Sequence, residues 1–192
     1  MEKPLIFSSA SEVRFRAVLR FIVPTYLTSL FNTLYTIVDG IFVSSYVGTN
    51  ALAAINIVYP IVNVLYGIAL IFATGGSAVA ALLIGSRREE EANRAFSVSL
   101  ICSLLLGCGI SLLFGLNLSP VLEWLGAPPA TMTDCQIYAI WWLMGAPLVI
   151  GKELFTYFIR VDGAPTYSFL TALAGGICNI VLDYLLVARL NM

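Results

Sequence analysis

The sequence predicts an all-α integral membrane protein with five transmembrane helices. Of its 192 residues, 59% are hydrophobic and only 11% are charged, and the mean hydropathy is +0.92. A water-soluble domain carries about 25% charged and about 45–50% apolar residues, so this chain folded in water would leave large apolar patches uncovered. The run 40–86 contains no charged residue at all, which points to the same class.

Uncharged runs and turn residues divide the chain into its helices. The run 40–86 is too long for one helix, and Gly48-Thr49-Asn50 is the expected turn within it. The polar segment 85–94 and the proline-containing segment 119–134 are expected to be loops, and Pro165 suits the first turn of the last helix. The predicted helices are 17–46, 51–84, 95–118, 135–159 and 165–189, preceded by a cytoplasmic segment 1–16 and followed by a truncated end, 190–192.

The basic residues predict the orientation in the membrane. One of the ten, Arg189, lies on the outer side of this topology, and Lys152 lies within the fourth helix. The other eight lie on the side of the N-terminus: Lys3, Arg14, Arg16, Arg20, Arg87, Arg88, Arg94 and Arg160. Because cytoplasmic loops are enriched in Lys and Arg, we expect a multi-pass protein of the cell membrane with its N-terminus in the cytoplasm and its C-terminus outside.

The composition also excludes several classes of function. The chain has no histidine, which rules out Ser-His and Cys-His nucleophilic sites and imidazole metal sites. The net charge of −1 argues against a nucleic-acid partner. The four cysteines do not follow disulfide or zinc spacing, and we interpret them as packing residues. We therefore expect neither enzymatic activity nor a nucleic-acid surface.

Asp39 and Asp183 are the most informative residues, because an acid inside the hydrocarbon core is costly and normally marks an ion or proton pathway. Asp39 lies 18 residues beyond Phe21, and Asp183 lies 18 residues beyond Pro165. Both helices run outward, so at 1.5 Å per residue both acids lie about 27 Å from the cytoplasmic face. They can form one site if their helices touch. The alternative is that one or both, above all Asp183, meet water at the membrane boundary.

Two further polar residues fall near this level. Asn179 precedes Asp183 by four residues, which places its amide on the same helix face one turn below. Tyr138 lies early in the fourth helix, which runs inward, so it also falls in the outer half of the membrane. Oxygen ligands of these kinds suit Na⁺, and two neighbouring carboxyl groups can instead share a proton. The predicted cation- or proton-binding site consists of Asp39, Asn179, Asp183 and Tyr138, with Na⁺ held by the first three and no cofactor besides this coupling ion.

Pro24 and the dipeptide Lys152-Glu153 are the other notable features within the predicted helices. A proline inside a helix removes a backbone donor and bends the helix. Since Pro24 shares its helix with Asp39, we interpret it as a conformational hinge, with ordinary packing as the alternative. Lys152 can extend its ammonium to the cytoplasmic interface, and Glu153 can pair with a basic neighbour. We expect a structural role for these two residues.

Three short segments carry a resemblance to a known family. Pro24 is followed fifteen residues later by Asp39, which lies in a V-D-x-x-F-V motif that leads to a glycine turn and A-L-A-A. Residues 160–165 read RVDGAP before the last helix, and residues 179–183 read NIVLD within it. In this order and at these spacings, the segments resemble the N-terminal lobe of the multidrug and toxic compound extrusion (MATE) transporters.

The resemblance implies an antiporter that expels small amphipathic or cationic compounds in exchange for Na⁺ or H⁺. The cation site of the family's N-lobe maps onto Asp39, Asn179 and Asp183, with Tyr138 as a further member, and its hinge proline maps onto Pro24. Members of the family have twelve helices in two lobes, whereas this sequence predicts five. We therefore expect an N-terminal fragment, an incomplete six-helix lobe that needs a second lobe or another copy for transport.

Two other functions are compatible with parts of the sequence. A lipid-linked oligosaccharide flippase of the same broad superfamily would carry several basic residues in a central cavity, whereas the spans offer only Lys152. A membrane scaffold that does not transport would assign no role to Asp39. A membrane enzyme is disfavoured, because no pair of nucleophile and base is apparent.

Overall fold

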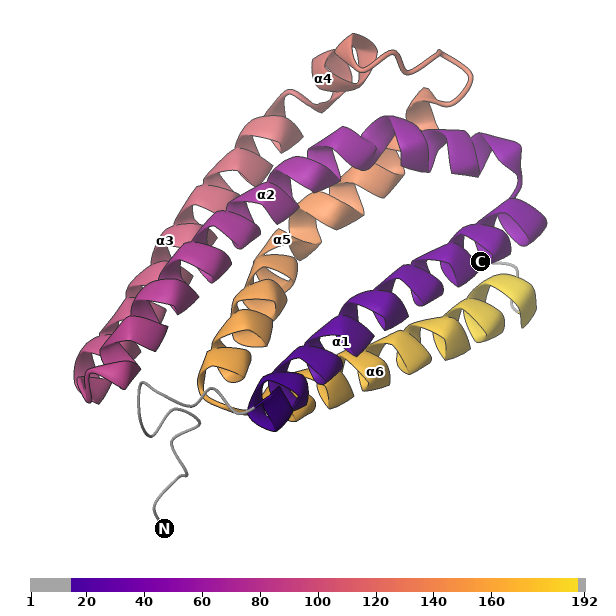
Figure 1. The fold of residues 1–192 in the computed structure, drawn as a ribbon. Coiled ribbons are helices and arrows are strands. Elements are labelled where there is room, and N and C mark those ends of the chain that lie inside the picture. Colours follow the sequence, from indigo (N-terminus) through magenta and orange to yellow (C-terminus); the bar gives the residue numbers. More distant parts are fainter. Residues whose placement is uncertain (1–14, 190–192) are drawn as a thin grey trace.

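Figure 1 shows the fold in a computed structural model, which describes residues 15–189. Within that range the chain forms helices and no strands. Most of the expected cytoplasmic segment 1–16, and the expected end 190–192, lie outside the described residues. The elements are α1 (Phe15–Phe42), a π-helical turn (Val43–Val47), α2 (Thr49–Gly85), α3 (Glu89–Leu116), α4 (Leu118–Trp124), α5 (Met132–Val161), α6 (Pro165–Leu182) and a second π-helical segment (Asp183–Arg189).

Five helical segments of the described chain are long and apolar enough to cross a membrane. They are Ile22–Val47, Thr49–Gly85, Glu89–Leu116, Met132–Val161 and Pro165–Leu186. The shortest has 22 residues, which at 1.5 Å per residue exceeds the about 30 Å hydrocarbon core of a bilayer. The predicted fold class, an all-α membrane protein with five spans, is confirmed.

The connections follow the turn residues of the sequence. Gly48 lies between the π-helical turn that follows α1 and the start of α2. Its φ is +110°, a backbone conformation that glycine adopts at little energetic cost. The peptide N–H of Gly48 donates to the carbonyl of Val43 over 3.2 Å. Pro165 begins α6, where its missing N–H has no helical partner to lose.

The spans pack in two groups. α2 packs along both α3 and α5, and buried apolar residues such as Leu65 of α2 and Leu143 and Ala146 of α5 form a core cluster there. We call α2, α3 and α5 the frame. α1 packs instead along α6, and Figure 1 shows these two helices side by side, diverging from the frame. Contacts between α5 and α6 join the α1–α6 pair to the frame.

Small residues permit close helix contacts in both groups. A Cβ atom added to Gly107 of α3 would collide with the side chain of Ile150 on α5. A Cβ atom added to Gly176 of α6 would collide with Phe31 of α1 and lie 3.1 Å from Cδ1 of Tyr35. Close packing through small residues is typical of helices in membranes, where apolar burial alone does not favour association.

The structure differs from the predicted boundaries at two loops. The segment 85–94 was expected to be a loop throughout, but α3 begins at Glu89. Its first turn holds Glu89, Glu90 and Glu91, and acids at a helix N-terminus are stabilised by the helix dipole. The seven-residue helix α4, which begins at Leu118, occupies the first part of the segment 119–134, and α5 begins at Met132 rather than at 135.

Candidate cation-binding site

Asp39 and Asp183 come together where α1 and α6 run side by side. Asp39 lies one turn before the end of α1, and Asp183 is the first residue of the π-helical segment that follows α6. Both residues are partly buried, and their carboxyl groups lie within hydrogen-bonding reach of each other. An ionised carboxyl group can only accept hydrogen bonds, so a hydrogen bond between the two groups requires one proton.

Two oxygen atoms beside this contact lack partners. The Asn179 side-chain oxygen and one carboxyl oxygen of Asp183 are buried, and no group among residues 15–189 donates a hydrogen bond to either. Asn179 precedes Asp183 by one helical turn, so both oxygens lie on one face of the helix. Unpaired buried acceptors are costly, and a bound cation or proton would satisfy them. The predicted set of Asp39, Asn179 and Asp183 therefore forms one local site.

Tyr138 lies near these residues but does not join them. It projects from α5 and is half-buried, and it is close enough to Asp39 for an electrostatic interaction. Its side chain is hydrogen-bonded to Trp142, and the two rings meet edge to face with centroids 6.4 Å apart. Among the described residues no hydrogen bond links Tyr138 to either acid. In this arrangement Tyr138 borders the site, and its role as a ligand stays a prediction.

The ligand chemistry of the site favours a hard cation. It offers two carboxyl groups and one amide oxygen, and such oxygen ligands suit Na⁺ rather than a transition metal. The described residues contain no cluster of three or more His, Cys, Asp or Glu side chains that could hold a metal. The unpaired oxygens of Asn179 and Asp183 fit either Na⁺ or a shared proton.

Pro24 lies inside α1, fifteen residues before Asp39. The hydroxyl group of Thr28 donates a 2.8 Å hydrogen bond to the Pro24 carbonyl, and Thr28 is almost fully buried. A threonine that bonds to the carbonyl four residues earlier weakens and often bends a helix, and a proline does the same by removing a donor. The proline and the threonine therefore weaken the same turn of α1, on the N-terminal side of Asp39.

Sequence reasoning missed the polar ladder that continues from this turn. The hydroxyl groups of Thr33 and Thr36 donate to the carbonyls of Ser29 and Asn32, over 3.0 Å and 2.9 Å. The recurrence of threonine, serine and asparagine four residues apart was a readable signal. It indicates that α1 is polar along its length between Pro24 and Asp39.

Trp142 belongs to a group of aromatic rings beside the candidate site. The structure places its ring between those of Tyr138 and Tyr66, with centroids 6.4 Å and 6.2 Å away. Tyr66 belongs to α2, so these rings form an aromatic row across two helices of the frame. The four-residue spacing of Tyr138 and Trp142 was the signal in the sequence.

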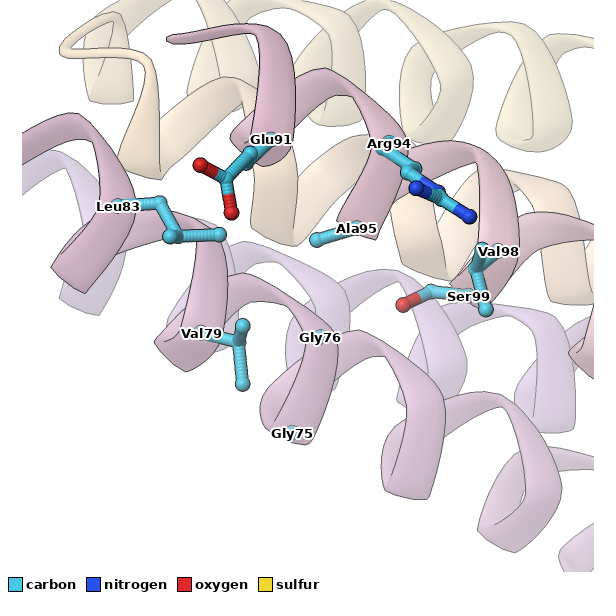
Figure 2. Close-up of a pocket in the computed structure, with 9 residues that line it drawn as sticks. All are labelled: Gly75, Gly76, Val79, Leu83, Glu91, Arg94, Ala95, Val98 and Ser99. Atoms are coloured by element: carbon cyan, nitrogen blue, oxygen red, sulfur yellow. The ribbon is translucent and has the colours of Figure 1, made fainter. Parts of the chain in front are cut away.

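A groove in the frame is a separate feature, shown in Figure 2. It lies between α2 and α3, has a volume of about 490 Å³ and contains none of the predicted site residues. Its lining consists of Gly75, Gly76, Val79, Leu83, Glu91, Arg94, Ala95, Val98 and Ser99. Glu91 also accepts a 2.6 Å hydrogen bond from Nε of Arg88. The candidate cation site is therefore the acid pair and not this groove.

Five membrane spans with a pair of neighbouring acids between two of them define a multi-pass helical membrane protein. The model of the MatE family matches residues 24–185, and the chain belongs to this family. The matched range contains Pro24, Asp39, Asn179 and Asp183.

The chain is similar to curated and solved transporters over part of their length. It is 28% identical over 186 residues to the multidrug export protein MepA of Staphylococcus saprophyticus, covering 97% of this chain and 41% of that protein. It is 28% identical over 153 residues to the FAD transporter of Shewanella oneidensis, covering 80% and 34%.

A solved structure shows the same fold. It is described as the outward-facing conformation of a multidrug resistance MATE family transporter of the MOP superfamily. The match has a TM-score of 0.81 and 28% identity, and it covers 88% of this chain and 37% of the solved one. The chain thus spans about two fifths of the length of the proteins it resembles.

Proposed function

We propose that this chain forms most of the N-terminal lobe of an efflux antiporter that exports small amphipathic or cationic compounds in exchange for Na⁺ or H⁺. The observation that carries the proposal is the contact between the carboxyl groups of Asp39 and Asp183 beside unpaired buried oxygens. An acid inside the membrane normally marks an ion or proton pathway, and a pair of such acids can bind a cation or share a proton. Similarity to MepA supports export of drug-like compounds.

In this proposal the coupling ion acts through the charge of the acid pair. With both carboxyl groups ionised, their repulsion disfavours close packing of α1 against the end of α6. A proton between them, or Na⁺ ligated by Asp39, Asp183 and Asn179, offsets this repulsion and draws the two helices together. The loaded and empty states therefore favour different positions of α1.

Pro24 allows α1 to convert this change into motion. The turn at Pro24 and Thr28 is the weakest part of the helix, because a proline and a threonine both disturb its backbone hydrogen bonds. Movement of the outer part of α1 would bend the helix at this turn. We propose that Pro24 is the hinge that couples ion binding to the position of α1.

Transport also requires a partner for this lobe. Alternating access in secondary transporters arises from two repeats that rock about a shared site. We propose that a second lobe or another copy supplies the missing half, within the lipid bilayer of the cell membrane. The distribution of basic residues supports a cytoplasmic N-terminus and an outer C-terminus. Robust transport by the 192-residue chain alone in proteoliposomes would contradict this requirement.

The test is ion-driven efflux by a two-lobe protein that contains this chain, reconstituted in proteoliposomes with ethidium as substrate. We expect Asp39→Asn and Asp183→Asn each to abolish efflux driven by a Na⁺ or H⁺ gradient. Asp134→Asn is the matched control, because Asp134 is an exposed acid at the start of α5. Unchanged efflux in both site variants would contradict ion coupling through this pair and favour a scaffold role.

A further inference from the structure

The groove between α2 and α3 lies next to the short loop that joins these two helices (Figure 2). Its wall on α2 runs from Gly75 to Leu83, two residues before the end of that helix. Its wall on α3 runs from Glu91, two residues after the start of that helix, to Ser99. At 1.5 Å per residue each wall is about 12 Å long, which approaches the depth of one leaflet in a hydrocarbon core of about 30 Å.

The groove is narrow at the helix contact and open toward its surroundings. A Cβ atom added to Gly76 would collide with the side chain of Ser99, so α2 and α3 touch there. A Cβ atom added to Gly75 would meet nothing within 4 Å, so the neighbouring position faces open space. Val79 and Val98, one on each helix, remain 50% and 52% exposed. The groove therefore offers apolar side chains from both helices to an acyl chain.

The charged residues of the groove leave one positive charge without a partner. Glu91 and Arg94 line it three residues apart on α3, a spacing at which opposite charges commonly pair. Glu91 instead accepts hydrogen bonds of 2.6 Å and 2.5 Å from Arg88, and Figure 2 shows the Arg94 side chain extending away from Glu91. Among residues 15–189, Arg94 has neither an ion-paired nor a hydrogen-bonded partner. An anionic group would supply the missing charge.

The position of Arg94 along α3 matches the level of lipid headgroups. Arg94 lies five residues beyond the start of α3, about 8 Å along the helix. With its 28 residues α3 is about 42 Å long, so a centred helix extends about 6 Å beyond the hydrocarbon core at each end. Arg94 is thus close to the boundary between hydrocarbon and headgroups, where basic side chains bind lipid phosphates.

We propose that this groove binds an anionic phospholipid of the inner leaflet, such as phosphatidylglycerol. Arg94 receives the headgroup phosphate, and one acyl chain lies over Gly75 and between Val79 and Val98. In this lipid no headgroup ammonium offsets the phosphate, so its single negative charge complements the unpaired arginine. The placement in the inner leaflet rests on the proposed topology, whereas the binding itself does not depend on ion coupling.

The experiment is titration of the 192-residue chain in detergent micelles with phosphatidylglycerol, with bound lipids counted by native mass spectrometry. Phosphatidylcholine and phosphatidylethanolamine with the same acyl chains are the matched probes, because each carries a positive charge beside its phosphate. We expect the first phosphatidylglycerol to bind about fivefold more tightly than either, which is the contribution of one basic residue to binding of anionic lipid.

Charge variants test the headgroup contact. Arg94→Gln should weaken binding of phosphatidylglycerol about fivefold and remove its preference over the other two lipids. Arg87→Gln is the matched control and should change binding less than about twofold, because Arg87 is an exposed arginine that does not line the groove. Glu91→Gln should strengthen binding about twofold to threefold, because it removes a negative charge and frees Arg88.

A filled groove tests the contact with the acyl chain. Gly75→Leu places a side chain in the open space and should weaken binding of all three lipids alike, by about fivefold or more. Gly109→Leu is the control and should leave binding unchanged, because a Cβ atom there also meets nothing within 4 Å and Gly109 lies outside the groove. Free glycerol phosphate should not displace the lipid.

Four results would overturn the inference. They are equal binding of the three lipids by the parent chain, equal binding of phosphatidylglycerol by Arg94→Gln and Arg87→Gln, equal binding by Gly75→Leu and Gly109→Leu, and displacement of the lipid by free glycerol phosphate. If Gly75→Leu does not fold, the opposite effects expected of Arg94→Gln and Glu91→Gln still decide the question. Asp39→Asn should abolish Na⁺ binding and leave lipid binding unchanged, so failure of the coupling site is seen separately.

Discussion

The helices α2 and α5 of the frame bury a larger fraction of their residues than the helices of the α1–α6 pair do. In the most apolar 18-residue stretches of α2 and α5, 28% of the residues are buried, against 6% in the corresponding stretches of α1 and α6. The frame contains two buried apolar clusters, whereas the pair contains the acid pair, Pro24 and both π-helical segments. Elements with few buried contacts open and move most readily. The difference indicates that the frame supplies stability and the pair supplies the proposed coupling motion.

Leu65→Ala tests the frame and has the largest expected effect. Leu65 is fully buried in the apolar cluster of the frame, so its truncation should lower the free energy of unfolding by about 2–5 kcal/mol. Leu34→Ala is the matched control on α1, because Leu34 is 52% exposed and should cost less than about 1 kcal/mol. Unfolding in mixed micelles measures both. Equal costs would remove the distinction between the two groups.

Gly176→Leu tests the contact within the α1–α6 pair. The new side chain would collide with Phe31, and overpacking of this kind costs about 1–3 kcal/mol. We expect α1 to shift from α6 and Na⁺ affinity to fall about tenfold, equivalent to about 1.4 kcal/mol. Gly175→Leu is the control, since a Cβ atom there meets nothing within 4 Å. The measurement is ²²Na⁺ binding. Equal Na⁺ affinities of the two variants would show that the site does not depend on the contact between α1 and α6.

Thr28→Val should have the smallest effect, and it tests whether the turn at Pro24 is a hinge. The change keeps the shape of a buried side chain and removes the hydrogen bond to the Pro24 carbonyl. Because this bond competes with the helix, its loss should stiffen α1 by about 0.5–1 kcal/mol and slow amide exchange near Pro24 up to about fivefold. Thr33→Val removes a similar bond farther from the proline and serves as control. Equal slowing by both variants would argue against a hinge at Pro24.

The sequence was sufficient to predict the membrane spans and to place Asp39 and Asp183 at a common level. Runs without charge mark segments that only a membrane can accommodate, and equal distances from the helix starts placed Asp39 and Asp183 at one level. The start of α3 was missed because three consecutive glutamates read as a loop, although they stabilise a helix N-terminus. Local composition does not distinguish these two uses of acids.

Side-chain partners across helices could not be predicted from the sequence. Helical spacing places Tyr138 and Trp142 on one face of α5, but it does not reveal that the ring of Tyr66, from α2, lies 6.2 Å from the ring of Trp142. Likewise, only the fold shows that Tyr35 and Tyr66 come near Lys152, and the structural role of Lys152 and Glu153 stays a prediction. Contacts of this kind depend on which helices pack together, and periodicity within one helix carries no such information.

The most direct test of the acid pair is infrared difference spectroscopy on the chain in nanodiscs, with its aspartate carboxyl carbons labelled with ¹³C. A hydrogen bond between Asp39 and Asp183 requires a proton, so we predict the signal of one protonated aspartate per chain, diminished by Na⁺ and absent in the Asp39→Asn, Asp183→Asn double variant. A parent spectrum in which every aspartate is ionised in the absence of Na⁺, or a protonated signal that persists in the double variant, would contradict the account.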